Sequence, residues 1–488
     1  MTQFFHNGSG LLTGRITAQG TDLIDDTYVY DGVGRMRQAR REINASLLAD
    51  ATFAYNDLSQ MTQETQQLLG GDVLVLDHTY DQAGNRQMMD CTSADYVCLD
   101  YEYDVVNRAT KITRMDTGNV LADYVYTGLY LDERIVHTNT GVQLFTSYVY
   151  NDQRRREWII NCAGSGGCGS PLASFNYEYD AVGNRTRADA NGTQGFQAYD
   201  FGYTYDDLHR LTDTLDADPQ GDDAESFDLD RLSNRTNYTK TVGGTPTSIP
   251  YGANNAANEY STIDGGAVEY DAAGNLYEDE NDYRFFYDFE NRLIRIERFV
   301  AGGFGPQTLG TGAPGATWTM IAAYSYDALG RRIQASASNG WWIASESFYY
   351  DGQRLLAEYN SPGGTLGTPA RFFIDGPTYI DEHLVIHDGF TGVDHYYLPQ
   401  ELHTVAGLAD ETGALVESYR YDAYGAVSVY DAQGTWQPKS AVGNPYNFTG
   451  RRLDIHSSGI AIPRLDLYHS RARTLNPRDG RFYQRDPL

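Results

Sequence analysis

Two histidines lie four residues apart in the stretch 380–388, with three acidic residues among their neighbours. On a helix, His383 and His387 would share one face and could hold a metal ion together with a third ligand. The surrounding residues are of the types that favour strands, and no third ligand is set by the spacing. We therefore expect a structural or surface role for both histidines and no metal site.

The other sequence patterns that signal catalysis are missing. The chain contains no G-x-S-x-G, H-E-x-x-H or phosphate-binding loop, no dinucleotide fingerprint in a strand–helix context, and no complete calcium-binding loop. The cysteines have no activating histidine nearby. From the residues alone, we expect no cofactor and no ordinary enzymatic site.

The four cysteines form two local pairs, Cys91 with Cys98 and Cys162 with Cys168. Neither pair has the C-x-x-C spacing of zinc sites or thioredoxin-like sites. Both pairs lie in turn-like inserts, so each could close a short disulfide loop and indicate an oxidising destination. The alternative is four reduced thiols without a function, and we favour the disulfides.

The elements that must position any site come from one repeated Tyr-Asp motif. Its first clear copy is Tyr28-Val29-Tyr30-Asp31-Gly32-Val33-Gly34-Arg35, and similar copies recur to Tyr419–Gly425. The tyrosines at 30, 55 and 80 are separated by 25 residues, and those at 80, 103 and 126 by 23. A nearly fixed step of this size is the signature of a repeat architecture.

The motif predicts a β-hairpin. The two rings of Tyr-x-Tyr share one strand face, and the following Asp can accept backbone N–H groups in a turn. Gly or Asn three residues after the Asp supplies the positive φ that the turn requires. A single hairpin cannot bury its tyrosine row, but stacked neighbours can. The sequence therefore predicts an all-β array of hairpins in a long coiled sheet.

The tyrosine rows allow two interpretations. Tyrosine rings can stack on sugars while aspartates bond hydroxyl groups, which would make the hairpins carbohydrate-binding. Rows of this kind more often serve cross-strand packing, and we favour packing.

Composition limits the partners. The chain of 488 residues has a net charge of −29 and 39 tyrosines. The charge argues against nucleic acid and anionic membrane surfaces as partners, and favours solubility or a wall that faces basic cargo. No apolar run is long enough to span a bilayer, and Met1–Gly8 has no signal-peptide pattern.

Near its end the chain carries a series of short motifs. They are Asn444-Pro445-Tyr446-Asn447-Phe448-Thr449-Gly450-Arg451-Arg452-Leu453-Asp454, Leu467-Tyr468, Arg471-Ala472-Arg473, Gly480-Arg481-Phe482 and Asp486-Pro487. This series resembles the Rhs-repeat-associated core of bacterial Rhs proteins. The Tyr-Asp array resembles the YD repeats of Rhs proteins, of toxin-complex B and C subunits, and of teneurins. This resemblance implies a spiral sheet that forms a hollow shell, complete or partial.

The resemblance also implies a site. In the Rhs family the core ends in an aspartyl autoprotease, in which an Arg, the Asp of a first Asp-Pro motif and a second Asp in a later motif cut the chain before a toxin. By this resemblance Asp486 corresponds to the first Asp, and Arg473 to the Arg. The second Asp and the cleavage site are not in the sequence, so we expect no proteolysis from the chain as given. Arg473 and Asp486 would then form a structural ion pair.

The resemblance thus implies two domains, a YD array over 1–393 and a core over 394–488. It implies a bacterial scaffold that encapsulates and delivers a C-terminal toxin, with that cargo or a second shell subunit as partner. The alternative is a secreted or cell-surface adhesion protein whose tyrosine-rich hairpins bind a glycan or a protein. Either role implies export, although the sequence shows no route for it.

Overall fold

A computed structural model describes residues 2–71, 73–91, 98–169, 171–193, 195–216, 223–301, 316–338, 343–360, 369–456 and 464–486. These residues form antiparallel strands, together with the two 3₁₀ turns η1 (Glu401–His403) and η2 (Phe448–Gly450). The predicted all-β hairpin array is confirmed. Among the described residues, no helix is long and apolar enough to cross a membrane.

The first 21 strands pair in sequence order in one sheet, which we call the outer coil. They are β1 (Thr2–His6), β2 (Leu12–Gln19), β3 (Asp22–Tyr30), β4 (Met36–Ile43), β5 (Ser46–Tyr55), β6 (Met61–Leu68), β7 (Val73–Tyr80), β8 (Arg86–Cys91), β9 (Leu99–Tyr103), β10 (Ala109–Arg114), β11 (Val120–Thr127), β12 (Tyr130–His137), β13 (Gln143–Tyr150), β14 (Arg156–Gly164), β15 (Pro171–Tyr179), β16 (Arg185–Gly192), β17 (Tyr199–Tyr205), β18 (Leu211–Asp216), β19 (Asp223–Leu229), β20 (Arg235–Val242) and β21 (Thr245–Pro250).

A short hairpin leads into a second sheet of 15 strands, which we call the inner coil. The hairpin is β22 (Thr262–Ile263) with β23 (Gly266–Ala267). The inner coil is β24 (Glu269–Tyr270), β25 (Leu276–Glu278), β26 (Tyr283–Tyr287), β27 (Leu293–Ala301), β28 (Ala316–Tyr326), β29 (Arg332–Ser338), β30 (Ile343–Asp351), β31 (Arg354–Tyr359), β32 (Arg371–Asp375), β33 (His383–Asp388), β34 (Val393–Pro399), β35 (Val405–Ala409), β36 (Leu415–Tyr421), β37 (Val427–Asp431) and β38 (Trp436–Gln437).

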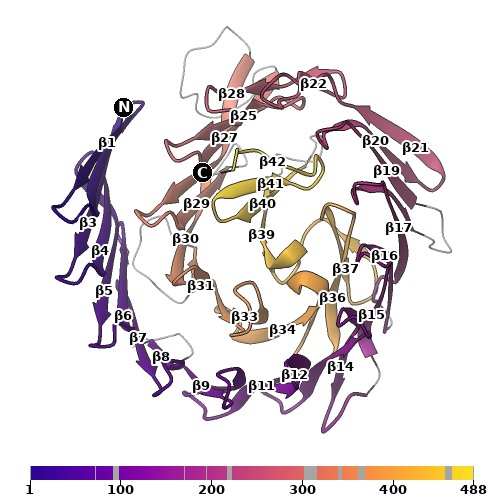
Figure 1. Cartoon of the computed structure of the whole chain (residues 1–488), viewed down its shortest axis with the longest axis horizontal. Helices are drawn as coiled ribbons and strands as arrows, with labels where there is room; N and C mark the ends of the chain where they lie inside the picture. Colours follow the sequence, from indigo (N-terminus) through magenta and orange to yellow (C-terminus); the bar gives the residue numbers. More distant parts are fainter. Residues whose placement is uncertain are drawn as a thin grey trace.

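Residues 444–486, which we call the C-terminal segment, carry a last sheet of four strands. These are β39 (Arg452–His456), β40 (Leu465–Ser470), β41 (Arg473–Asn476) and β42 (Arg481–Phe482). Figure 1 shows the outer coil as the outside of a spiral, the inner coil running within it, and the yellow C-terminal segment innermost.

The turns of the repeats explain the Asp and Gly of the motif. The Asp31 side chain accepts hydrogen bonds from the backbone N–H groups of Val33 and Arg35, at 3.0 and 2.9 Å. Gly34 has a φ of 90° and donates its N–H to the Asp31 carbonyl. In the corresponding turn, Asn107 takes the left-handed position with a φ of 65°. The hairpin mechanism predicted from the sequence is therefore confirmed.

Replacing the glycine of such a turn should destabilise the fold measurably. Gly34→Ala places a Cβ on a residue with positive φ, and we expect a cost of about 1 kcal/mol in unfolding free energy. Gly32→Ala is the matched control, because Gly32 has open space at its Cβ and no positive φ. Calorimetric unfolding of both variants checks the prediction, and equal melting temperatures would contradict it.

The second tyrosine of each motif fastens one hairpin to the previous one. The Tyr103 hydroxyl donates to the Arg86 carbonyl at 2.8 Å, and the Tyr126 hydroxyl donates to the Ala109 carbonyl at 3.0 Å. The same contact recurs in both coils, at Tyr80, Tyr150, Tyr179, Tyr205, Tyr287, Tyr326, Tyr350 and Tyr421. The packing interpretation of the tyrosine rows is therefore confirmed, since their hydroxyls are bonded within the sheet.

The main hydrophobic core lies between the two coils. Its fully buried members come from both, for example Leu76 and Ile159 of the outer coil with Leu384 and Ala406 of the inner coil. Polar contacts also join the coils, including the ion pair of Arg331 with Glu64 at 2.6 Å. Each coil therefore covers an apolar face of the other.

The predicted domain boundary at 393/394 falls inside strand β34, after its first residue. β33 and β34 form one hairpin, and both belong to the inner coil. The division into a repeat array and a core therefore stays a prediction, with a continuous sheet running across it.

Candidate functional site

The motif that begins at Asn444 binds the inner coil through side-chain amides and aromatic rings. The Asn444 amide oxygen accepts the Tyr397 hydroxyl at 2.9 Å, and its amide nitrogen donates to the Tyr446 carbonyl at 2.8 Å. The Tyr446 ring stacks on His383 with ring centroids 3.7 Å apart. The start of the C-terminal segment is thus held by buried polar groups that have partners on both sides.

Gly450 brings the segment into backbone contact with the inner coil. Its φ is 66°, and a Cβ would lie 2.5 Å from the Asp381 carbonyl oxygen, so no larger residue fits. His383 lies 2.9 Å from the Gly450 carbonyl through Nε2 and 2.7 Å from Asp375 through Nδ1. Burial opposes the charged imidazole, but the Asp375 carboxylate outweighs it and raises the pKa of His383.

A buried ionic network follows immediately. Arg452 pairs with Glu358, with Glu346 at 2.9 Å and with Asp454 at 3.3 Å. Arg332 of β29 pairs with the same Asp454 at 2.5 Å. Although burial opposes ionisation, these two guanidinium groups hold the pKa of Asp454 well below its usual range. The network joins the C-terminal segment to the inner coil. Removing one charged partner would leave the other buried without a counterion, which is strongly destabilising.

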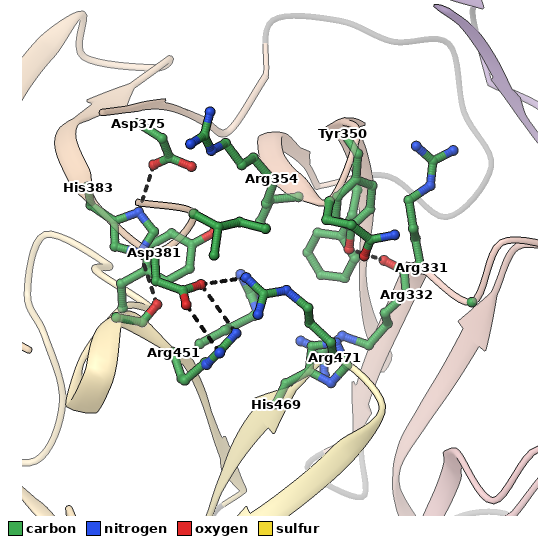
Figure 2. Close-up of a pocket in the computed structure, with 18 residues that line it drawn as sticks. Arg331, Arg332, Tyr350, Arg354, Asp375, Asp381, His383, Arg451, His469 and Arg471 are labelled. Atoms are coloured by element: carbon green, nitrogen blue, oxygen red, sulfur yellow. Dashed lines mark hydrogen bonds and ion pairs between the residues drawn. The ribbon is translucent and has the colours of Figure 1, made fainter. Parts of the chain in front are cut away.

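Beside this network lies a small cavity of about 70 Å³ between the inner coil and the C-terminal segment (Figure 2). Six arginines and only two carboxylates line it, namely Arg331, Arg332, Arg354, Arg451, Arg452 and Arg471 with Asp375 and Asp381. His383, His469 and Gln353 also line it. This concentration of positive charge contrasts with a chain that has 66 acidic and 37 basic residues.

The residues carried over from the autoprotease resemblance lie together. Arg473 of β41 is 3.2 Å from Asp486, and its guanidinium lies 3.8 Å from the centre of the Phe482 ring. The Asp486 side chain is 77% exposed, so water reaches this ion pair. The structure brings the two residues together, and their part in a cleavage reaction stays a prediction.

Three further acids with buried side chains had no signal in the sequence. Asp279 and Glu280 lie between β25 and β26, and Asp479 lies between β41 and β42. Burial, with the charge of Glu280, raises the pKa of Asp279 to about 8 and that of Asp479 to about 7. Arg478 is 3.9 Å from Glu280. Asp279 and Asp479 can therefore hold protons near neutral pH where the C-terminal segment meets the inner coil.

The cysteines divide into one described pair and one that is not described. Cys162 and Cys168 form a disulfide, with Cα atoms 5.5 Å apart. The Cys91 side chain lies outside the described residues, so its pairing with Cys98 stays a prediction. The Cys98 sulfur lies 3.0 Å from an Asp90 carboxylate oxygen.

The two histidines of β33 have separate partners. His383 contacts Asp375 and Gly450, whereas His387 contacts Asp394 at 2.5 Å and stacks on Phe372. Within the described residues, no group of three or more His, Cys, Asp or Glu could hold a metal ion. Their contacts are those of structural residues.

Solved structures of Tc toxins contain the same fold. The crystal structure of TcdB2–TccC3 without its hypervariable C-terminal region matches 100% of this chain with a TM-score of 0.70 at 16% identity. The Tc holotoxin pore of Photorhabdus luminescens gives the same values. This chain has the Rhs shell fold. It covers 26% of each of those chains, and at this identity the agreement concerns the fold.

Sequence similarity to known proteins is distant. The tRNA nuclease WapA of Bacillus subtilis strain 168 is 25% identical over 261 residues, which are 54% of this chain. The tRNA3(Ser)-specific nuclease WapA of Bacillus spizizenii is 24% identical over 261 residues. The chain spans only 9% of these relatives. No family model matches it. Together with the Rhs shell fold, this similarity confirms the resemblance to Rhs and YD-repeat proteins.

Proposed function

We propose that this chain is the shell scaffold of a secreted bacterial toxin system, which encloses and delivers a toxic C-terminal segment. The observation that carries the proposal is the position of the C-terminal segment within the inner coil (Figure 1). Buried ion pairs of Arg452 and Asp454 hold it there. The match of this chain, over its full length, to part of TcdB2–TccC3 supports the same role.

Cargo or a second shell subunit would be the partner. The solved relatives pair TcdB2 with TccC3, and one of them also contains Cdc42. In this chain Arg485, near the end of the described residues, lies 2.7 Å from Glu259, which is in the segment between β21 and β22. A polypeptide that continued the chain would begin at that contact.

We assign Arg473 and Asp486 to one half of an aspartyl autoprotease. The ring of Phe482 supports the Arg473 guanidinium, which faces Asp486. A second carboxylate beside this pair would supply the other half, because two close carboxyl groups separate their pKa values and can serve as acid and base.

The intact mass of the product of the native reading frame tests this function. We expect a large species that ends beyond Leu488 and a separate small C-terminal fragment. Asp486→Asn should abolish the cut, whereas Asp431→Asn, a change in an exposed turn, should leave it intact. A single product ending at Leu488 would contradict the proposal and favour an adhesion protein.

A further inference from the structure

The arginine-lined cavity of Figure 2 has more positive charge than its lining neutralises. Arg331 forms ion pairs with the carboxylates of Asp327 and Glu64. Arg332 and Arg452 are neutralised by the buried network around Asp454. These three arginines therefore need no further partner.

Of the remaining three arginines, two share one carboxylate. Arg451 and Arg471 both contact Asp381, at 3.1 and 2.7 Å. The other lining carboxylate, Asp375, is occupied by His383. Of the described acidic residues, none lies within 4.0 Å of Arg354 in an ion pair. Its Nη2 donates to the Tyr379 carbonyl at 3.3 Å, and its buried Nε has no hydrogen-bond partner.

The environment of the cavity shows the effect of this charge. Burial and the neighbouring Arg471 lower the pKa of Arg451, against the effect of Asp381. Burial and the charge of Arg332 lower the pKa of His469 well below its ordinary value, so this imidazole is neutral and offers one N–H. Water could fill the space but could not supply the missing negative charge.

We propose that this cavity binds one small oxyanion group, of phosphate or carboxylate chemistry, between Arg354, Arg451 and Arg471. Guanidinium groups hold such anions through paired, charge-assisted hydrogen bonds. A volume of about 70 Å³ admits one group of this size.

The anion would join two parts of the molecule. Arg354 belongs to the inner coil, whereas Arg451 and Arg471 belong to the C-terminal segment. A bound anion therefore strengthens the docking of the segment, and its loss loosens it. This binding site does not depend on the proposed toxin function, since it requires only the described chain.

Calorimetric titration of this chain with inorganic phosphate, at constant ionic strength set with chloride, tests the site. We expect saturable binding of one phosphate, and at least about tenfold weaker binding by Arg354→Gln. Arg35→Gln is the matched control, because Arg35 pairs with Asp31 in an outer turn. If Arg354→Gln does not fold, Arg471→Gln should show the same weakening.

A parallel titration with acetate distinguishes the two ligand chemistries. Saturation by phosphate alone assigns a phosphate group, and saturation by acetate assigns a carboxylate. The preferred anion should also slow amide hydrogen exchange in 464–476. Absence of saturation by either anion, or equal affinities of Arg354→Gln and Arg35→Gln, would overturn the proposal.

Discussion

Asp454→Asn should be among the most destabilising single changes in the C-terminal segment, at about 3–5 kcal/mol of unfolding free energy. Asp454 is the only acidic residue in the described part of the chain that forms an ion pair with Arg332, whose side chain is 3% exposed. Asparagine keeps the shape but removes the charge, so Arg332 stays buried without a counterion. Arg452 loses one of its three carboxylates in the same change.

Differential scanning calorimetry measures this loss, and limited proteolysis locates it. We expect cleavage within the C-terminal segment to become faster while the outer coil stays resistant. Asp486→Asn is the matched control, because the Asp486 side chain is 77% exposed and loss of its ion pair with Arg473 should change stability little. Equal effects of the two substitutions would show that the buried network does not hold the segment.

Asp279→Asn should stabilise the protein at pH 8 more than at pH 5. Burial raises the pKa of Asp279 to about 8, whereas an unfolded aspartic acid titrates near 4. The folded chain therefore binds more protons than the unfolded chain between these values, and stability falls as pH rises through them. Over the range from pH 5 to pH 8, the variant should gain about 3 kcal/mol relative to the unmodified chain.

Asparagine keeps the local hydrogen bonds, because Asp279 accepts the N–H groups of Tyr283 and Asn281. Asp479→Asn should behave in the same direction with a smaller gain, because burial and Glu280 raise the pKa of Asp479 only to about 7, against the opposing charges of Arg478, Arg235 and Arg481.

Asp431→Asn is the control for this pH dependence. Backbone N–H groups lower the pKa of Asp431, so its contribution is lost only as pH falls below about 4. Its effect on stability should therefore be constant from pH 5 to pH 8. Urea denaturation at a series of pH values gives these differences. If the difference in unfolding free energy between Asp279→Asn and the unmodified chain did not change with pH, proton binding by Asp279 would be contradicted.

The hairpins were predictable because their determinants are local. Asp31 and Gly34 lie within one turn, and their roles follow from hydrogen bonding and φ alone. The stacking of the coils was not predictable in the same way. Glu64 and Arg331 are 267 residues apart, and no period in the sequence relates one coil to the other.

The same difference between local and long-range contacts separates the candidate sites that were predictable from those that were not. Arg473 and Asp486 occupy neighbouring elements and were expected to meet, as were Cys162 and Cys168. The buried acid Asp279 meets Asp479 only because the C-terminal segment returns to the inner coil. The arginine cavity likewise brings together residues of separate elements. In the sequence, nothing distinguishes each of these arginines from an ordinary surface arginine.

The most direct test of the central claim is an electron cryomicroscopy map of the protein produced from its native reading frame. We expect a two-coil spiral sheet with the C-terminal segment inside the inner coil, Arg452 beside Glu358, and any following polypeptide enclosed by the spiral. A map in which the C-terminal segment lies on the outer surface, or in which following residues emerge outside the coils, would contradict the claim.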